Sequence, residues 1–240
     1  MPERRAAAAV FASGSGTNFQ TLLDMEPRGA AWRTVLLVSD RDDAGALDRA
    51  RLAGVETRVI AVKGRSPEDV ERETLEALRG AGVEVIFLAG YLRLVPPGVV
   101  RAFRRRILNI HPALLPSFGG KGMYGMHVHR AVLGAGVRVT GPTVHFVDER
   151  YDEGTVVAQW PVPVLPDDTP ETLQARVLAA EHRIYPLAAD HLARCVTEGR
   201  EPGALELAGG AFTLVQGPGG VGLDELVRHR FPPDSGTPNP

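Results

Sequence analysis

The sequence predicts an α/β fold, in which a mostly parallel β-sheet carries helices on both of its faces. Three observations lead to this class. Short apolar runs alternate with amphipathic stretches through residues 1–100, the runs are rich in valine, isoleucine and leucine, and a glycine turn at 13–16 joins the first run to the first helical stretch. Strands that alternate with helices are typical of a parallel sheet covered on both faces. Such a sheet binds ligands beyond the carboxyl ends of its strands.

In the N-terminal half, the apolar runs mark the expected strands and the amphipathic stretches mark the expected helices. Ser66 is a capping residue that precedes Pro67, and proline at the first helical position is a typical helix start. Strands are expected at residues 7–12, 34–39, 57–62, 83–89 and 107–110, and helices at 18–25, 44–53 and 67–81.

The C-terminal half begins with a loop rich in proline and glycine at 112–126. Alternating patterns then indicate strands at 139–147 and 155–164. Residues 169–196 form one long helical pattern, in which Pro186 is expected to introduce a kink.

The composition changes beyond residue 198, where glycine and proline dominate. Apolar pieces at 212–215 and 223–227 are expected to pack as a small appendage, and a loose tail is expected from Phe231. We therefore expect one domain at 1–198, followed by a C-terminal extension at 199–240 that is partly loose.

Composition excludes several classes of protein. The chain has 240 residues, 44% of them hydrophobic and 23% charged, with a formal net charge of −2. These values exclude a disordered chain and a coiled coil, and they give no global field that attracts nucleic acid. The one cysteine cannot form an internal disulfide, which fits a reducing compartment. No apolar stretch reaches the roughly 20 residues of a membrane span.

The apolar run at 6–12 is too short for a typical signal peptide and leads directly into the glycine turn. We interpret it as a first strand and expect a cytoplasmic protein with small-molecule substrates, no nucleic-acid or membrane partner and no bound metal. The chain is expected to be a monomer or a homodimer.

The turn at 13–18 is the first candidate site. Glycines let a backbone approach a ligand closely, and the free N–H groups at a helix start favour phosphate. A dinucleotide fingerprint needs a third glycine where this chain has Phe19, although Asp40 could imitate the ribose-binding acid. The turn therefore favours a mononucleotide or sugar phosphate over NAD. A tight turn with a capped helix and no ligand is the alternative.

Asn109 and His111 are the second candidate site. Residues two apart on a strand point to the same side, so an amide and an imidazole share one strand end. This pair suits the stabilisation of an oxyanion together with proton transfer. A histidine that only satisfies loop backbone groups is the alternative. Asp152 lies in the polar loop 148–154, for which a solvated hairpin tip is the alternative.

Two further groups of residues favour structural roles. His127 and His129 have no acidic or cysteine partner at the spacing of metal ligands. Arg101 and the arginines at 104–106 have no aromatic residues between them, so a solvated helix end is favoured over an RNA site.

Five short motifs carry a resemblance to the phosphoribosylglycinamide formyltransferases, the folate-dependent members of the formyltransferase family that act in purine synthesis. In chain order they are S-G-S-G-T-N at 13–18, L-A-G-Y-L-R-L-V at 88–95, N-I-H-P-A-L-L-P at 109–116, G-P-T-V-H-F-V with D-E-R-Y-D-E-G at 141–154, and R-V-L-A-A-E-H-R-I-Y-P at 176–186. Each motif alone is weak, but five in the order of the family are specific. The resemblance covers residues 7–198.

The resemblance implies a Rossmann-like formyltransferase fold and the transfer of a formyl group from 10-formyltetrahydrofolate, a co-substrate, to the amine of glycinamide ribonucleotide. It implies that Asn109 and His111 face the formyl oxygen, and that Asp152 raises the pKa of His111. The binding residues that it implies are Gly16, Thr17 and Asn18 for the ribose phosphate; Leu178, Ala179, Ala180 and Glu181 for the glycinamide part, with Glu181 at the amine; and Arg65, Leu92, Arg93, Leu94, Val95, Asn109, Asp148, Glu149, Arg150, Tyr151 and Asp152 for the folate.

The chain departs from the family pattern at several positions. Leu178 stands where some relatives have glutamine, and Pro67 stands where relatives often have an arginine, which leaves open whether Arg65 reaches the ligand. Methionyl-tRNA formyltransferase, formyltetrahydrofolate deformylase and a non-catalytic dinucleotide-binding module are the competing interpretations. The first needs a larger RNA-binding domain, the second an N-terminal regulatory domain, and the third a further glycine.

Overall fold

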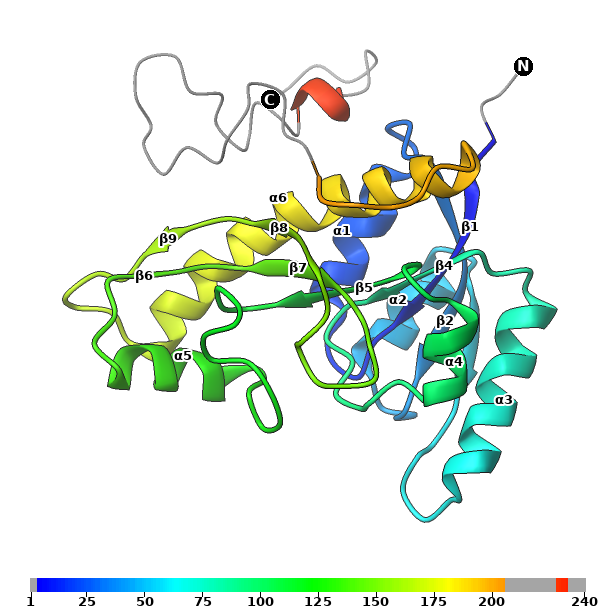
Figure 1. Cartoon of the computed structure of the whole chain (residues 1–240), viewed down its shortest axis with the longest axis horizontal. Coiled ribbons are helices and arrows are strands. Elements are labelled where there is room, and N and C mark those ends of the chain that lie inside the picture. Colours follow the sequence, from blue (N-terminus) through cyan, green and yellow to red (C-terminus); the bar gives the residue numbers. More distant parts are fainter. Residues whose placement is uncertain (1–3, 206–227, 233–240) are drawn as a thin grey trace.

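The structure, a computed structural model, describes residues 4–205 and 228–232. Seven strands form one sheet in the order β3-β2-β1-β4-β5-β7-β8 (Figure 1). The pairs among the first five strands of this order are parallel, whereas the pairs β5–β7 and β7–β8 are antiparallel. The mostly parallel sheet is therefore confirmed. The strands are β1 Ala6–Phe11, β2 Trp32–Ser39, β3 Glu56–Val59, β4 Val85–Leu88, β5 Ile107–His111, β7 Thr143–Phe146 and β8 Val156–Gln159; β6 Val139–Thr140 and β9 Val162–Pro163 form a second, small sheet.

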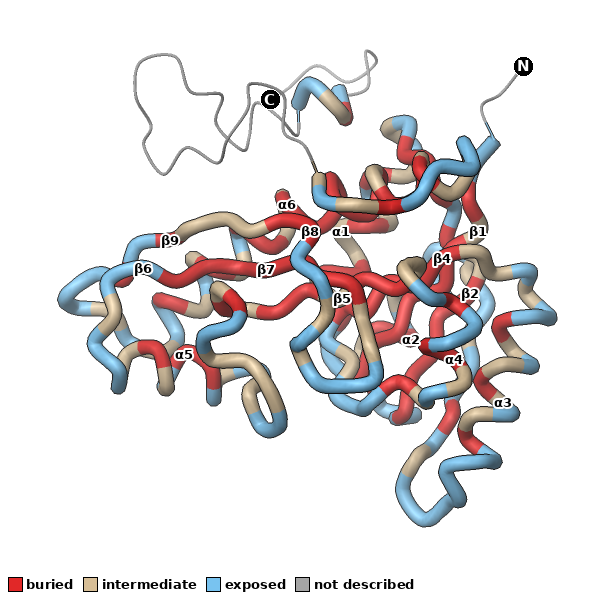
Figure 2. The backbone as a smooth tube through the Cα atoms, in the orientation of Figure 1, coloured by how far each residue is buried: buried red, intermediate tan, exposed pale blue. Residues whose placement is uncertain are grey.

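Helices cover both faces of the large sheet, as predicted. Alternate residues of β1 enter opposite cores: Val10 packs in the core that contains α1, α2 and α6, whereas Phe11 packs in the core that contains α3 and α4. Figure 2 shows the strands as the buried centre of the molecule. The helices are α1 Thr17–Met25, α2 Gly45–Leu52, α3 Pro67–Gly80, α4 Pro97–Ala102, α5 Met126–Gly134 and α6 Pro170–Thr197.

Sequence patterns missed two helices and joined strands that the structure separates. α4 has only six residues, too few for a clear helical pattern. α5 begins directly after Gly125, at the end of the loop rich in glycine and proline, and no side chain caps it. The expected strands at 139–147 and 155–164 are each divided in two, and Gly141, with a φ of 141°, lies in the first break. Pro186 lies inside α6, which continues to Thr197; the kink stays a prediction.

Residues 228–232, which we call the C-terminal clasp, pack against the body of the domain. Phe231 is fully buried, and its ring meets that of Trp32 edge-on, with centroids 6.3 Å apart. Arg230 forms an ion pair with Asp190 of α6. The expectation of a loose tail from Phe231 is therefore wrong for Phe231 itself, because its ring completes a core. The expected apolar pieces at 212–215 and 223–227 lie outside the described residues.

Within residues 4–205 and 228–232, the helices are too short or too polar for any of them to cross a membrane.

Candidate active site

A cavity of about 240 Å³ opens beyond the carboxyl ends of β4 and β5, on the side where a parallel sheet is expected to bind its ligands. Its wall combines the loop after β4, the end of β5, the loop before α5, the β7–β8 loop and one face of α6. Predicted site residues in the wall are Asn18, Leu92, Arg93, Leu94, Val95, Asn109, His111, Asp148, Arg150, Tyr151, Asp152, Leu178 and Glu181.

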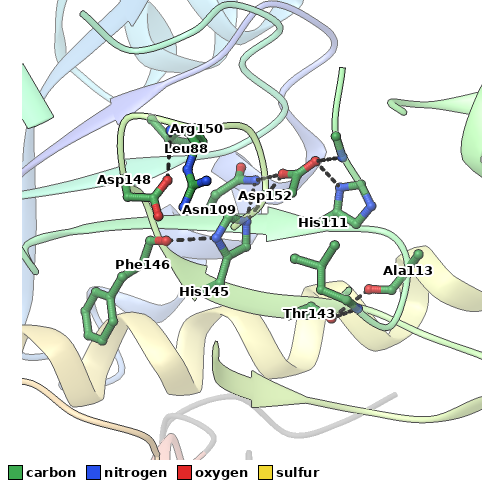
Figure 3. Close-up of polar contacts among 12 residues, drawn as sticks. Leu88, Asn109, His111, Ala113, Thr143, His145, Phe146, Asp148, Arg150 and Asp152 are labelled. Atoms are coloured by element: carbon green, nitrogen blue, oxygen red, sulfur yellow. Dashed lines mark hydrogen bonds and ion pairs between the residues drawn. The ribbon is translucent and has the colours of Figure 1, made fainter. Parts of the chain in front are cut away.

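Asn109 and His111 enter this cavity from β5. The strand lies between β4 and β7, so its position is fixed from both sides. The amide nitrogen Nδ2 of Asn109 lies 3.0 Å from Nε2 of His145 and 3.5 Å from Oδ1 of Asp152. The predicted side-by-side arrangement of the amide and the imidazole is present (Figure 3).

Asp152 reaches the pair from the loop between β7 and β8. Its backbone φ of 58° is in the left-handed region, and its side chain is 11% exposed. Oδ2 accepts a hydrogen bond of 2.9 Å from the backbone N–H of Gly120. A Cβ on Gly119 would lie 3.2 Å from that of Asp152 and 2.5 Å from Leu115 Cδ2, so glycine is what permits the close approach. The solvated hairpin tip is therefore ruled out for this side chain.

His111 has both ring nitrogens directed at protein oxygen atoms. Nε2 lies 2.9 Å from the carbonyl oxygen of Phe118, and Nδ1 lies 3.6 Å from Oδ2 of Asp152. Because a carbonyl oxygen only accepts, Nε2 carries a proton. In the neutral ring, the lone pair of Nδ1 then faces the carboxylate of Asp152, which is repulsive. Protonation of Nδ1 replaces this repulsion with an attraction between opposite charges.

Burial is the largest influence on the pKa of His111 and lowers it, whereas Asp152 and the Phe118 carbonyl raise it and His145 lowers it. The net pKa lies below the ordinary histidine value. Asp152 acts in the predicted direction, but the expectation of a more basic His111 is wrong, because desolvation outweighs the carboxylate. Burial would raise the pKa of Asp152 itself, yet the hydrogen bond from His145, the charge of His111 and the Gly120 N–H together lower it.

His145 is a site residue that the sequence analysis did not single out. It pairs with Asn109 across β5 and β7, and its Nδ1 lies 2.8 Å from the Phe146 carbonyl oxygen. Nδ1 therefore carries a proton. In the neutral ring Nε2 accepts from the amide of Asn109, whereas a protonated ring can donate from Nε2 to Oδ1 of Asp152, 3.5 Å away. The contact with His145 orients Asn109. The sequence T-V-H-F could have indicated this residue, because alternation along β7 places His145 on the same face of the sheet as its partner Asn109 on β5.

Glu181 is a second buried carboxylate in the cavity. It comes from α6, is 7% exposed, and its Oε2 accepts a hydrogen bond of 2.6 Å from Nδ2 of Asn18. Burial raises the pKa of Glu181 to about 7, and the hydrogen bond from Asn18 opposes this shift. Leu178 lines the same wall, whereas Ala179 and Ala180 are outside it, and Ala180 packs in the core between α5 and α6.

The glycine turn has its own geometric requirement. Gly16 has a φ of 74°, and a Cβ there would lie 2.8 Å from the backbone of Ala46. No side chain caps α1, so its first backbone N–H groups are available to a ligand. Gly16 and Thr17 stand outside the cavity wall, and Asn18 is the member of the turn that reaches it.

The predicted folate residues divide into two groups. Arg93 lines the cavity, and its Nε donates a hydrogen bond of 2.7 Å to Asp40, whose side chain is 1% exposed. Arg65 instead pairs with Glu73 of α3, and Glu149 lies 3.4 Å from Arg101; neither Arg65 nor Glu149 lines the cavity. The structure thus places these two away from the predicted pocket.

His129, for which the sequence favoured a structural role, lies in the cavity wall. It is 2% exposed, and its Nδ1 is buried without a hydrogen-bond partner in the described residues. Burial and the neighbouring His111 both lower its pKa. Among residues 4–205 and 228–232, no group of three or more histidine, cysteine or acidic side chains is arranged to hold a metal ion.

Comparison with known protein families gives one match that covers most of the domain. The family described as "Formyl transferase" matches residues 6–189. Among curated proteins, the phosphoribosylglycinamide formyltransferase, chloroplastic, of Arabidopsis thaliana is 48% identical over 185 residues, which are 76% of this chain and 63% of the relative. The trifunctional purine biosynthetic protein adenosine-3 of Bos taurus is 42% identical over 190 residues, 77% of this chain and 18% of the relative.

Solved structures agree with these matches. Glycinamide ribonucleotide transformylase 1 from Symbiobacterium toebii superposes with a TM-score of 0.73 at 43% identity, covering 82% of this chain and 89% of that one. Phosphoribosylglycinamide formyltransferase from Bacillus halodurans gives a TM-score of 0.73 at 36% identity, covering 81% and 97%. The chain spans about three fifths of the length of the plant relatives, at 63% and 59%.

Proposed function

Because the chain belongs to the formyl transferase family, we propose that it transfers the formyl group of 10-formyltetrahydrofolate to the amine of glycinamide ribonucleotide, a step of purine biosynthesis. The observation that carries the proposal is the meeting of Asn109, His111 and Asp152 at one end of the cavity. The names of the curated and structural relatives support formyl transfer and the choice of acceptor.

The proposed chemistry is a direct acyl transfer. The amine nitrogen attacks the formyl carbon, and the carbonyl oxygen becomes an oxyanion. The C–N bond to the folate then breaks, the folate nitrogen gains a proton, and the attacking amine loses one. Asn109 is positioned to donate from Nδ2 to the oxyanion, and such a donor typically contributes about 10²–10³ in rate.

His111 supplies the second donor in this proposal. With Nδ1 protonated and directed at Asp152, the proton on Nε2 is the one that reaches the substrate. In this structure Nε2 donates that N–H to the carbonyl oxygen of Phe118, which lies 2.9 Å from Nε2. Substrate binding must therefore replace the Phe118 contact with the formyl oxygen. Phe118 has a left-handed φ of 56° and is followed by two glycines, so its backbone is the segment that we expect to move in this exchange of partners.

The two proposed substrates bind at different places around the cavity. The backbone N–H groups at the start of α1, from the turn of Gly16, Thr17 and Asn18, hold the ribose phosphate, because a helix start favours an anion. Glu181 accepts from the amine, and Leu178 gives an apolar contact. The folate lies along residues 92–95 and the loop 148–152.

Formyl transfer is tested with purified full-length protein, 10-formyltetrahydrofolate and glycinamide ribonucleotide, with His111→Ala as the matched control. We expect formylated ribonucleotide and deformylated folate in equal amounts. Release of free formate without acceptor would support a hydrolase instead, and formylation of methionyl-tRNA would support the tRNA enzyme. Either result without transfer to glycinamide ribonucleotide contradicts the proposal.

We also propose a cytoplasmic location and a monomeric or homodimeric state, with small molecules as the partners. The plant relatives are named chloroplastic. Cell fractionation and light scattering test the two statements, and an organellar or larger assembly would contradict them.

A further inference from the structure

The side chain of Asn18 contacts the carboxylate of Glu181. Its only donor group, Nδ2, lies 2.6 Å from Oε2 of Glu181. Both residues are buried, at 9% and 7% exposure. The two helices that carry them, α1 and α6, lie side by side (Figure 1). The contact therefore links the glycine turn to the carboxylate in the cavity.

Besides the second N–H of Nδ2, the Asn18 side chain keeps one acceptor. Oδ1 is buried and has no hydrogen-bond partner within the described residues. A phosphate offers acceptor oxygens, so it gains nothing from Oδ1 and is repelled by its partial negative charge. One N–H of the Asn18 amide is thus held by Glu181, and the backbone N–H groups of the turn are the donors for the phosphate.

We propose that the Asn18 side chain is a positioning residue that acts through Glu181: it holds one carboxylate oxygen and leaves the other, together with its own Oδ1, as acceptors for the amine of the substrate. This inference rests on the proposed function, since it names how that site holds its acceptor. Acceptors on one side suit an amine, which donates its N–H groups to them and keeps its lone pair for the formyl carbon.

The electrostatic surroundings fit this role. Burial makes the ionised form of Glu181 costly, and the N–H of Asn18 offsets part of that cost. Tyr185 lies one turn further along α6, and its phenol interacts electrostatically with Glu181. The other titratable groups in the cavity wall are Tyr91, Arg93, His111, Tyr124, His129, His145, Asp148, Arg150, Tyr151 and Asp152. Burial and the Asn18 hydrogen bond are the influences on the pKa of Glu181, so Asn18 is the group whose removal should raise that pKa.

The test is a titration of Glu181 by carbon NMR in full-length protein with labelled glutamate carboxyls, where Glu181→Gln identifies the signal. We expect a midpoint near 7 in the unmodified protein, and an upward shift of roughly one pH unit in Asn18→Leu, which keeps the volume and removes the donor. Asn18→Ser, which is too short to reach, gives the same measurement if the leucine variant does not fold. Thr17→Val is the control, because it changes the same turn without touching Glu181.

Kinetics supply the second measurement. In Asn18→Leu the acid limb of kcat/KM for glycinamide ribonucleotide should move to higher pH by the same amount, and activity should recover as the pH rises. A phosphate ligand would instead raise KM by one factor at every pH. An unmoved Glu181 titration, or a uniform rise in KM with an unmoved limb, overturns the inference. The NMR titration needs no turnover, so failure of formyl transfer in the unmodified protein would remove the proposed function and leave the Asn18–Glu181 contact tested separately.

Discussion

Helix α6 buries two carboxylates, Glu181 near its middle and Asp190 further towards its C-terminus, and their surroundings differ. Glu181 faces the cavity and accepts one hydrogen bond, from Asn18. Asp190 lies at the C-terminal clasp, where it accepts from the backbone N–H of Ala31 and from the guanidinium groups of Arg194 and Arg230. Both are nearly inaccessible, at 7% and 3% exposure.

The difference in partners indicates a ligand-binding role for Glu181 and a structural role for Asp190. A buried charge that is paired and hydrogen-bonded holds elements together, and here Asp190 joins α6 to the clasp and to Ala31, the residue before β2. A buried charge with few partners is costly, and proteins keep such groups where a ligand completes them. Substitutions in the cavity should therefore lower activity without lowering the stability of the fold. Substitutions at the clasp should lower stability without lowering activity.

The largest expected effect is on Asn109 and His111, the proposed catalytic pair. Asn109→Ala and His111→Ala should each lower turnover by at least about 10², because each removes a donor to the forming oxyanion. The double variant should lose less than the product of the two losses, since both donors act on one oxygen. Steady-state formyl transfer measures this, together with thermal unfolding. A melting temperature that falls in step with turnover would show that the pair supports the fold instead.

Glu181→Gln should weaken the reaction and strengthen the fold. Because burial raises the folded-state pKa of Glu181 from 4.5 to about 7, the stability of the unmodified protein falls as the pH rises through that interval. Glutamine carries no charge, so at pH 8 the variant should be more stable by roughly 3 kcal/mol. Urea unfolding at pH 8 and at pH 4.5 checks the sign. An equal gain at both pH values would mean that packing, and not ionisation, is the cause.

Asp190→Asn should show the opposite pattern. It leaves Arg230 and Arg194 without their charge partner, and because both arginines are partly exposed we expect a loss of about 2 kcal/mol, below the usual cost of breaking a fully buried pair. Formyl transfer should be unchanged at 25 °C. Asp48→Asn is the matched control, because the pair of Asp48 with Arg51 is exposed and should contribute little. Equal losses in the two variants would mean that the clasp contributes no special stability.

Asp152→Asn should move a pH profile more than it changes binding. Asp152 raises the pKa of His111 against the larger effect of burial, so its neutralisation should lower that pKa further. The fall of turnover towards alkaline pH should then begin at lower pH, with roughly tenfold less turnover at pH 7. Measurements from pH 5 to 9 test this. An unchanged profile would separate Asp152 from the catalytic histidine.

The smallest effect is expected from truncation after Pro233, which keeps the clasp. The melting temperature should change by less than about 5 °C, and turnover should be unchanged. Phe231→Ala in the full-length chain is the comparison, since it removes a fully buried ring from Trp32. A larger loss from the truncation than from Phe231→Ala would place the support beyond residue 233.

Local patterns were sufficient wherever neighbouring residues decide the conformation. The five parallel strands follow from apolar runs, α3 begins at the predicted Pro67 behind the Ser66 cap, and the alternation of β5 puts Asn109 and His111 on one side. The motifs also led to the family that the comparisons confirm. Such signals survive in one sequence because a strand or a helix cap is set by residues a few positions apart.

Long-range contacts decided the rest. Only the tertiary structure shows that Asp152 and His145 contact Asn109. It also shows that Asn18 donates a hydrogen bond to Glu181, and that Arg65 pairs with Glu73 and does not line the cavity. It also lowers the pKa of His111 where a nearby aspartate alone predicted a rise, and it buries Phe231 where glycine and proline predicted a tail. The physical reason is the same in each case: desolvation and pairing depend on which distant segments close over a group, and a one-dimensional pattern records its neighbours in the chain but not its neighbours in space.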